Sequence, residues 1–175
     1  MNTEGEKKGE NMKNRGITLV ELIVSISIIG ILLVLSYLWF ADWMARYRVE
    51  KATRELYADM MHARMDAISR SMDHYMVMDP ASYTMYEDKN EDGDPDAGEE
   101  LQTYPKKVEY VLDWNNKDSK TITFDKRGFV TPNRTVWFMS GAKPDCDCMR
   151  ISRTRIIMGR FRYKEDGTAD ECKID

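Results

Sequence analysis

The first clear pattern along the chain is an uninterrupted apolar run close to the N-terminus. Between Ile17 and Ala41, 25 residues carry a single charge, that of Glu21. A helix of about 20 apolar residues is long enough to cross the hydrocarbon core of a bilayer. We therefore predict a membrane-spanning helix over residues 17–41. A carboxylate in such a helix is costly in lipid, so Glu21 calls for a function and a charged partner.

A second pattern, with apolar residues three to four positions apart, follows from Asp42. These residues form two rows, one with smaller and one with larger members (Val49, Ala52, Leu56, Met60, Ala63 and Ala67; Tyr57, Met61, Met65, Ile68 and Met72). The spacing predicts an amphipathic helix that packs on a sheet or on sister helices. No proline or glycine interrupts residues 42–79. We expect one helix from Ile17 to about Met76, ~90 Å long, with His62 and His74 on its surface.

Beyond Pro80 the pattern changes to short runs in which apolar and polar residues alternate. Polar turns separate these runs, among them residues 115–118 and 126–128. Close turns between successive strands favour an antiparallel meander. The expected strands are Ala81–Tyr86, Val108–Trp114, Thr121–Asp125, Phe129–Thr131, Thr135–Ser140, Met149–Thr154 and Ile156–Tyr163. The predicted fold class is α+β, with a long N-terminal helix (residues 17–41 and 42–79) packed on a small antiparallel β head (residues 80–175).

Residues 1–16 form a polar leader in front of the apolar run. The two charges closest to the run, Lys13 and Arg15, are positive. By the positive-inside rule the N-terminus stays in the cytoplasm and the residues after Ala41 are exported. Met12 is an alternative start to Met1. The apolar core continues into a charged helix without a small-residue cleavage site, so a simple signal anchor is one interpretation.

The junction between leader and helix carries a more specific pattern. The stretch Arg15-Gly16-Ile17-Thr18-Leu19-Val20-Glu21-Leu22-Ile23-Val24 resembles the class III signal of type IV pilins and type II secretion pseudopilins. The resemblance implies that a prepilin peptidase cuts between Gly16 and Ile17 on the cytoplasmic side and that the new N-terminus is methylated. It also identifies Glu21 as the glutamate found five residues into the mature chain. Ile17 departs from the phenylalanine usual in the family.

Physical chemistry gives Glu21 a role in assembly. Cleavage leaves a positively charged amine on Ile17 in an apolar environment. A carboxylate from a neighbouring subunit can pair with this amine, and each charge then relieves the desolvation of the other. Such pairing would stack the helices with a fixed axial offset. Small and hydroxyl-bearing residues in the run provide surface for close helix packing (Gly30, Ser25, Ser27 and Ser36).

The predicted head resembles the GspH/FimT group of minor pseudopilins and minor pilins. The resemblance rests on Thr121–Phe129 and on Gly159-Arg160-Phe161-Arg162. In the DNA-uptake members of this group a Gly-Arg-x-Arg stretch contacts DNA, which makes Arg160 and Arg162 possible DNA contacts. A solvated strand face, or pairing with an acidic loop of a neighbouring subunit, would explain the same pattern. The net charge of −4 disfavours a general nucleic-acid binder.

An acidic stretch at residues 88–99 fits the calcium-loop pattern D-x-[DN]-x-[DN]-G-x5-E at every specified position. In such loops side-chain oxygens at positions 1, 3 and 5 converge and a final glutamate can bind through both oxygens. The sequence therefore predicts a structural Ca²⁺ site. The alternative is a solvated acidic turn. The expected ligands are Asp88, Asn90, Asp92, the Asp94 carbonyl and Glu99, with Asp96 acting through water.

Three cysteines lie in the last 30 residues: Cys146, Cys148 and Cys172. An oxidising exterior favours one disulfide, between Cys172 and either Cys146 or Cys148. Three sulfurs without an adjacent histidine do not make a convincing metal site. The sequence also shows no nucleophile–base arrangement or close carboxylate pair, so an enzyme is not expected.

These observations define three functional hypotheses. The first is a minor pseudopilin, a structural subunit of the type II secretion pseudopilus in the bacterial inner membrane, with its head in the periplasm. Its partners would be other pseudopilins, contacted through the N-terminal helix, and the prepilin peptidase. The second is a minor type IV pilin that acts in pilus assembly or DNA uptake. The third is a membrane-anchored calcium-binding module that does not polymerise.

Overall fold

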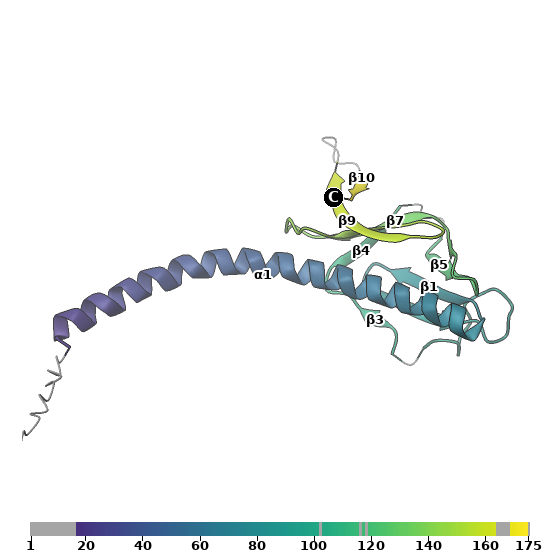
Figure 1. The fold of residues 1–175 in the computed structure, drawn as a ribbon, viewed down its shortest axis with the longest axis horizontal. Coiled ribbons are helices and arrows are strands. Elements are labelled where there is room, and N and C mark those ends of the chain that lie inside the picture. Colours follow the sequence, from purple (N-terminus) through teal and green to yellow (C-terminus); the bar gives the residue numbers. More distant parts are fainter. Residues whose placement is uncertain (1–16, 102, 116, 118, 164–168, 175) are drawn as a thin grey trace, which may run out of the picture. The chain divides into compact units, whose positions relative to one another are not determined.

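The computed structural model describes residues 17–101, 103–115, 117, 119–163 and 169–174. The chain divides into two compact units, residues 1–40 and residues 41–175. Among the described residues, the first unit contains the start of one long helix, and the second contains the rest of that helix and ten strands. Figure 1 shows these elements coloured along the sequence.

The long helix, α1, spans Leu19–Arg70, 52 residues in all. It ends where Ser71 adopts a left-handed conformation (φ 56°) and the Met72 backbone N–H donates to the Ala67 carbonyl (3.2 Å). This bond, from the second residue past the cap back into the last turn, defines a Schellman-type C-cap. The expectation that the helix continues to residue 79 is therefore wrong. Ser71 occupies the position at which glycine is usual, so the sequence has no glycine that would mark the end of the helix.

The strands form two five-stranded antiparallel sheets (Figure 1). In the first sheet the order is β3-β2-β1-β5-β6, and in the second it is β10-β9-β8-β7-β4. The strands of the first sheet are β1 (His74–Asp79), β2 (Ser82–Glu87), β3 (Lys106–Lys107), β5 (Thr121–Phe124) and β6 (Val130–Thr131). Those of the second sheet are β4 (Val111–Trp114), β7 (Arg134–Met139), β8 (Cys148–Ile151), β9 (Ile156–Tyr163) and β10 (Ala169–Lys173).

The antiparallel pairing confirms the sequence prediction, but the single meander does not hold. Strands β7 to β10 do follow one another as a meander. However, β4 pairs with β7 and β5 pairs with β1, so these two neighbours in sequence belong to different sheets. Periodicity identifies a strand without identifying its partner. Strand β1, which the sequence reading assigned to the helix, is the central strand of the first sheet.

The core of the second unit lies between α1 and both sheets. The smaller row of helix residues enters it, and Val49, Leu56, Met60 and Ala67 are fully buried. Both sheets contribute alternating inward side chains (Met76, Met78, Met85, Ile122 and Phe124 from the first sheet; Leu112, Val136, Phe138, Met149 and Ile151 from the second). The amphipathic stripe predicted for the helix therefore packs on sheets within the same chain.

The second row of helix residues behaves differently from the first. Met65 and Ile68 remain 64% and 50% exposed, whereas Tyr57 and Met61 are partly buried against the core. His62 is exposed, as expected. His74 is not a helix-surface residue, because it lies on β1 and is only 1% exposed, with its Nδ1 3.2 Å from the Met72 carbonyl oxygen.

Candidate functional site

The start of α1 is fixed by a capping arrangement around Thr18. The Glu21 backbone N–H donates to the Thr18 hydroxyl oxygen (3.2 Å), and the Leu22 N–H donates to the Thr18 carbonyl (3.1 Å). Thr18 and Glu21 have the Thr-x-x-Glu spacing of a capping box. Sequence reasoning assigned Glu21 to assembly and overlooked Thr18. The cap places the Glu21 carboxylate in the first helical turn, where the helix dipole favours negative charge.

The residues of the predicted processing site are exposed. Ile17 is 75% exposed and Glu21 is exposed as well. Gly16, on the leader side of the predicted cut, lies outside the described residues. Within the described part of the chain, the Glu21 carboxylate accepts no hydrogen bond and forms no ion pair. Its charge is therefore available for a group outside the described part of the chain.

The surface that follows Glu21 is apolar on every side. Leu32, Leu33, Val34 and Leu35 occupy consecutive positions and are each 55–67% exposed. By length and composition, α1 is the one helix in the described residues that could cross a membrane. The serine hydroxyls in the apolar run are satisfied internally, since each donates to the carbonyl four residues earlier (Ser25 to Glu21, Ser27 to Ile23 and Ser36 to Leu32). They therefore present small, already hydrogen-bonded surface to any neighbouring helix.

The acidic loop at residues 88–99 leaves β2 and returns beside it. The Glu87 backbone N–H donates to the Glu99 carbonyl (3.0 Å), and an isolated bridge joins Tyr86 to Glu100. At the first motif position Asp88 is only 4% exposed. Its Oδ2 accepts hydrogen bonds from the Tyr75 hydroxyl (2.8 Å) and the Gly93 N–H (3.2 Å). Burial and this hydrogen bond to Asp88 raise the pKa of Tyr75 above its ordinary value.

Like charges gather in the outer part of the loop. The neighbouring Asp92 carboxylate, followed by burial, raises the pKa of Asp96 above its ordinary value. Asn90 Nδ2 donates to Asp92 Oδ2 (2.9 Å) and so partly offsets this repulsion. Among the described residues, no three His, Cys, Asp or Glu side chains are grouped closely enough to hold a metal ion as they stand. The calcium site predicted from the sequence therefore remains a prediction.

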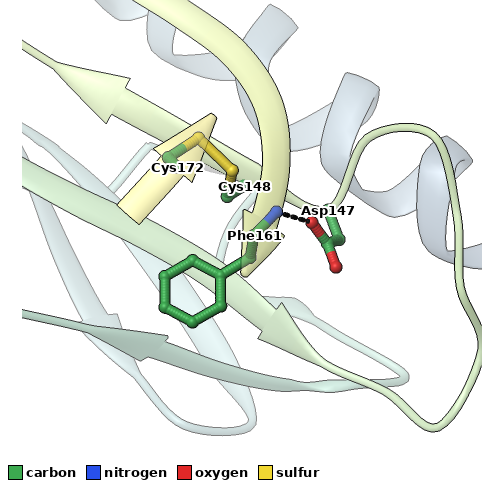
Figure 2. Close-up of a disulfide and its surroundings, with 4 residues drawn as sticks. All are labelled: Asp147, Cys148, Phe161 and Cys172. Carbon is green, nitrogen blue, oxygen red and sulfur yellow. Dashed lines mark hydrogen bonds between the residues drawn. A yellow bond between two sulfur atoms is a disulfide. The ribbon is translucent and has the colours of Figure 1, made fainter. Parts of the chain in front are cut away.

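A disulfide joins Cys148 on β8 to Cys172 on β10, across a sequence separation of 24 residues (Figure 2). The structure thus selects one of the two pairings left open by the sequence and leaves Cys146 as a free thiol. Both bonded cysteines are buried, in a small cluster with Trp137 and Phe161, whose rings stack with centroids 4.4 Å apart. The Phe161 N–H donates to Asp147 Oδ1 (2.6 Å), as Figure 2 shows.

The two arginines predicted as possible DNA contacts lie on β9. The guanidinium of Arg160 forms an ion pair with Asp145, whereas Arg162 is exposed. The glycine of this motif has a structural role. A Cβ atom on Gly159 would overlap the carbonyl oxygen of Lys173 and lie 3.0 Å from the Cys172 sulfur. Glycine at this position therefore permits β10 and the disulfide to approach β9 closely, independently of any nucleic acid.

Two segments of the chain match known protein families. Residues 52–154 match the family described as Type II transport protein GspH. Residues 11–37 match the Prokaryotic N-terminal methylation motif, and this range includes Gly16, Ile17 and Glu21. No curated protein matches the sequence significantly.

The chain is also similar to two solved structures. Both are crystal structures of the type IV minor pilin FimU from Pseudomonas aeruginosa strain PAO1, in two space groups, and both are 16% identical to this chain. The first covers 74% of this chain and 98% of its own, with a TM-score of 0.49. The second covers 70% and 98%, with a TM-score of 0.46. Because the GspH match spans more than half of the sequence, the chain belongs to the Type II transport protein GspH family.

Proposed function

We infer that this protein is a minor pseudopilin, a non-catalytic structural subunit of the pseudopilus of a type II secretion system. The observation that carries this function is the GspH match over residues 52–154, which follows an N-terminal methylation motif over residues 11–37. A chain with both features is a subunit that is processed at its N-terminus and assembled through its helix. The bacterial inner membrane is the site of insertion, with residues 1–16 cytoplasmic and the head periplasmic.

The geometry of the helix start supports assembly with sister subunits. Glu21 is exposed in the first turn of α1, and within the described chain its carboxylate is unpaired. The next residues offer apolar surface on all sides, which requires either lipid or other helices as neighbours. After prepilin peptidase has cut before Ile17, the new amine of one subunit would pair with Glu21 of another. The partners are therefore other pseudopilins or pilins, contacted through α1.

The role of Glu21 is tested by incorporation into filaments. We expect Glu21→Gln to reduce the amount of this subunit in sheared filaments at least about tenfold, since one charge pair is lost from an apolar environment. Glu55→Gln is the matched control, because Glu55 is an exposed glutamate farther along the same helix. Equal incorporation of the two variants would contradict an assembly role for Glu21.

The alternative is a minor type IV pilin, with or without a role in DNA uptake. Deletion of the gene in its native bacterium separates the two functions. A secretion subunit predicts that extracellular enzymes are retained in the cell while pili persist. Loss of pili or of transformation, with normal secretion, would favour the minor pilin.

DNA contact by Arg160 and Arg162 is tested separately. In a mobility-shift experiment, a DNA-binding head predicts that the double variant Arg160→Gln/Arg162→Gln releases DNA. The ion pair between Arg160 and Asp145 already neutralises one of the two charges. We therefore expect no DNA retention by either the wild-type protein or the variant at physiological salt.

A further inference from the structure

The acidic loop at residues 88–99 contains a buried carboxylate that the chain satisfies only in part. Asp88 is 4% exposed, and its Oδ2 accepts two hydrogen bonds, from Tyr75 and Gly93. Its other oxygen, Oδ1, is buried and has no hydrogen-bond partner among the described residues. Buried polar oxygens are normally paired, because an unpaired one retains its desolvation cost. An unpaired carboxylate oxygen at the first position of a calcium-loop motif points to a bound cation.

The buried carboxylate borders a hollow that is open to solvent at the surface of the loop. Asp88, Glu91, Asp92 and Gly93 line a cavity of about 230 Å³. Ser71, Met72, Asp73 and Lys126 complete the lining. The space exceeds the ~30 Å³ that one water molecule occupies in the liquid. A cation with part of its hydration shell therefore fits beside Asp88.

The backbone of the loop already has the turns that the motif requires. Gly93, at the sixth motif position, has φ 90°, a backbone conformation that residues other than glycine rarely adopt. The Asn90 side-chain oxygen accepts from the Asp92 N–H (3.1 Å), and the Asp92 Oδ1 accepts from the Asp94 N–H (3.0 Å). These turns keep the side chains at motif positions 1, 3 and 5 (Asp88, Asn90 and Asp92) within one short, tightly turned segment.

The last motif residue faces the interior of the loop. Glu99 is 7% exposed. Its Oε1 accepts from the Lys89 N–H (2.9 Å) and the Asn90 N–H (3.3 Å), and its Oε2 accepts from the Asp96 N–H (3.3 Å). Both carboxylate oxygens thus contact the loop from within. A small rotation of this side chain would exchange backbone donors for an ion.

We propose that residues 88–99 form a calcium-binding loop whose ligands close around Asp88 when the ion enters. The ligands are the side chains of Asp88, Asn90, Asp92 and Glu99 together with the Asp94 carbonyl. This set consists of hard oxygen donors with neither sulfur nor imidazole, which favours Ca²⁺ over zinc or copper. The carboxylates converge only with the ion, because their mutual repulsion otherwise keeps them apart. Calcium binding by this loop does not depend on filament assembly.

The bound ion would link the two ends of the loop, both of which lie next to β2 of the first sheet. Asp88 directly follows β2, and Glu99 precedes the bridge between Tyr86 and Glu100. A ligand that binds only the folded state stabilises that state. Extracellular modules bind calcium with dissociation constants of about 0.1–1 mM. The structure therefore predicts that millimolar calcium raises the unfolding temperature of the head.

The test uses the full chain in detergent, with Ca²⁺ and Mg²⁺ as separate probes. We expect about 5 mM Ca²⁺ to raise the unfolding temperature by about 4 °C or more, and the same concentration of Mg²⁺ to have a much smaller effect. Terbium bound in place of calcium should show luminescence sensitised by Tyr75, whose hydroxyl contacts Asp88. No calcium-dependent shift and no terbium signal from the wild-type chain would overturn the proposal.

Two matched variants test the ligand set. Glu99→Gln removes one charge at the last ligand position, and Glu100→Gln removes one charge at the adjacent residue, which is not a ligand. We expect Glu99→Gln to weaken Ca²⁺ binding about tenfold or more, whereas Glu100→Gln retains wild-type binding. The unfolding temperature of each variant without calcium shows that the head is folded. Equal weakening by both variants would overturn the proposal in favour of non-specific attraction to an acidic turn.

Discussion

The two halves of α1 differ in what surrounds them, although they form one helix. In residues 19–40 every large apolar side chain that the structure describes is exposed, and Leu33 is 65% exposed. In residues 49–67 one face is buried, and Leu56 has no exposed surface. The sheets that bury Leu56 belong to the same chain. The first half therefore depends on lipid or sister helices, and the second half depends on its own head.

The charges of the sequence already reflect this difference. The first half carries only Glu21, whereas charged residues recur throughout the second half. An element that is apolar all round needs an apolar environment on all sides, and an amphipathic one needs a single apolar partner. One continuous helix can therefore serve as an anchor and assembly element at one end and as part of a soluble core at the other.

The largest expected effect comes from truncating a leucine in each half of the helix. Leu56→Ala should lower the free energy of unfolding of the head by about 4 kcal/mol, because it removes a fully buried side chain and leaves a cavity. Leu33→Ala, the matched control, should change it by less than about 0.5 kcal/mol. Denaturant unfolding followed by tryptophan fluorescence in detergent measures both. Comparable losses in the two variants would contradict the division of α1 into two environments.

The disulfide should stabilise the head and leave the first half of the helix unaffected. Replacing both Cys148 and Cys172 by alanine reopens a loop of 24 residues. In the loop-entropy model this lowers the free energy of unfolding by about 3 kcal/mol. Cys146→Ala, which removes the free thiol, is the control and should have little effect. Equal unfolding midpoints for all three proteins would show that the bridge contributes nothing to stability.

A smaller effect is expected at Gly159, where β9 and β10 approach each other. Gly159→Ala would force a methyl group against the Lys173 carbonyl and should cost about 2 kcal/mol, a typical value for overpacking. Gly141→Ala provides the control, since no atom lies within 4 Å of its added Cβ. Thermal unfolding of the two variants measures the difference. If Gly159→Ala unfolds like wild type, the glycine is not needed for this approach, and its place in the Gly-Arg-x-Arg stretch needs another explanation.

The smallest effect concerns a polar contact between the helix and the first sheet. The Tyr83 hydroxyl donates to Asp59 Oδ2 (2.5 Å), and Lys106 Nζ also contacts Asp59 (2.7 Å). Tyr83→Phe should cost about 1 kcal/mol at neutral pH, the usual net contribution of one hydrogen bond. Tyr47→Phe, at an exposed position of the same unit, should cost less.

The pH dependence of this contact follows from the pKa of Tyr83. Burial, and then the hydrogen bond to Asp59, raise that pKa above the ordinary tyrosine value. When the pKa of a group is higher in the folded state than in the unfolded state, deprotonation of that group lowers the free energy of unfolding. The stabilisation is therefore complete below about pH 10 and is lost as the pH rises further. Tyr83→Phe should show a weaker alkaline loss of stability than Tyr47→Phe, and identical alkaline profiles would contradict this assignment.

Periodicity and charge made much of the fold predictable from the sequence. The apolar run, the amphipathic stripe around Leu56 and seven of the strand regions were identified because each depends on local pattern. The end of α1 was missed because Ser71 takes the left-handed conformation usually marked by glycine. Without that signal the residues of β1 fitted a helix, and His74 was placed on its surface. The two-sheet arrangement was missed because strand partners are set by long-range packing.

The candidate site was predictable to a different extent in each of its parts. The N-terminal methylation motif could be predicted because it is a linear pattern. Cleavage between Gly16 and Ile17 and the role of Glu21 stay predictions. The partner of Arg160 could not, because Asp145 is 15 residues away and is brought near only by the fold. The unpaired oxygen of Asp88 is likewise a property of burial that no spacing rule reveals.

We propose that the exposed half of α1 belongs to a processed, assembling subunit. Mass determination of the mature protein from its native bacterium tests this claim most directly. We expect a chain that begins at Ile17 and carries one added methyl group on its N-terminal amine. A mature protein that retains residues before Ile17, or that is cut after the apolar run, would contradict it.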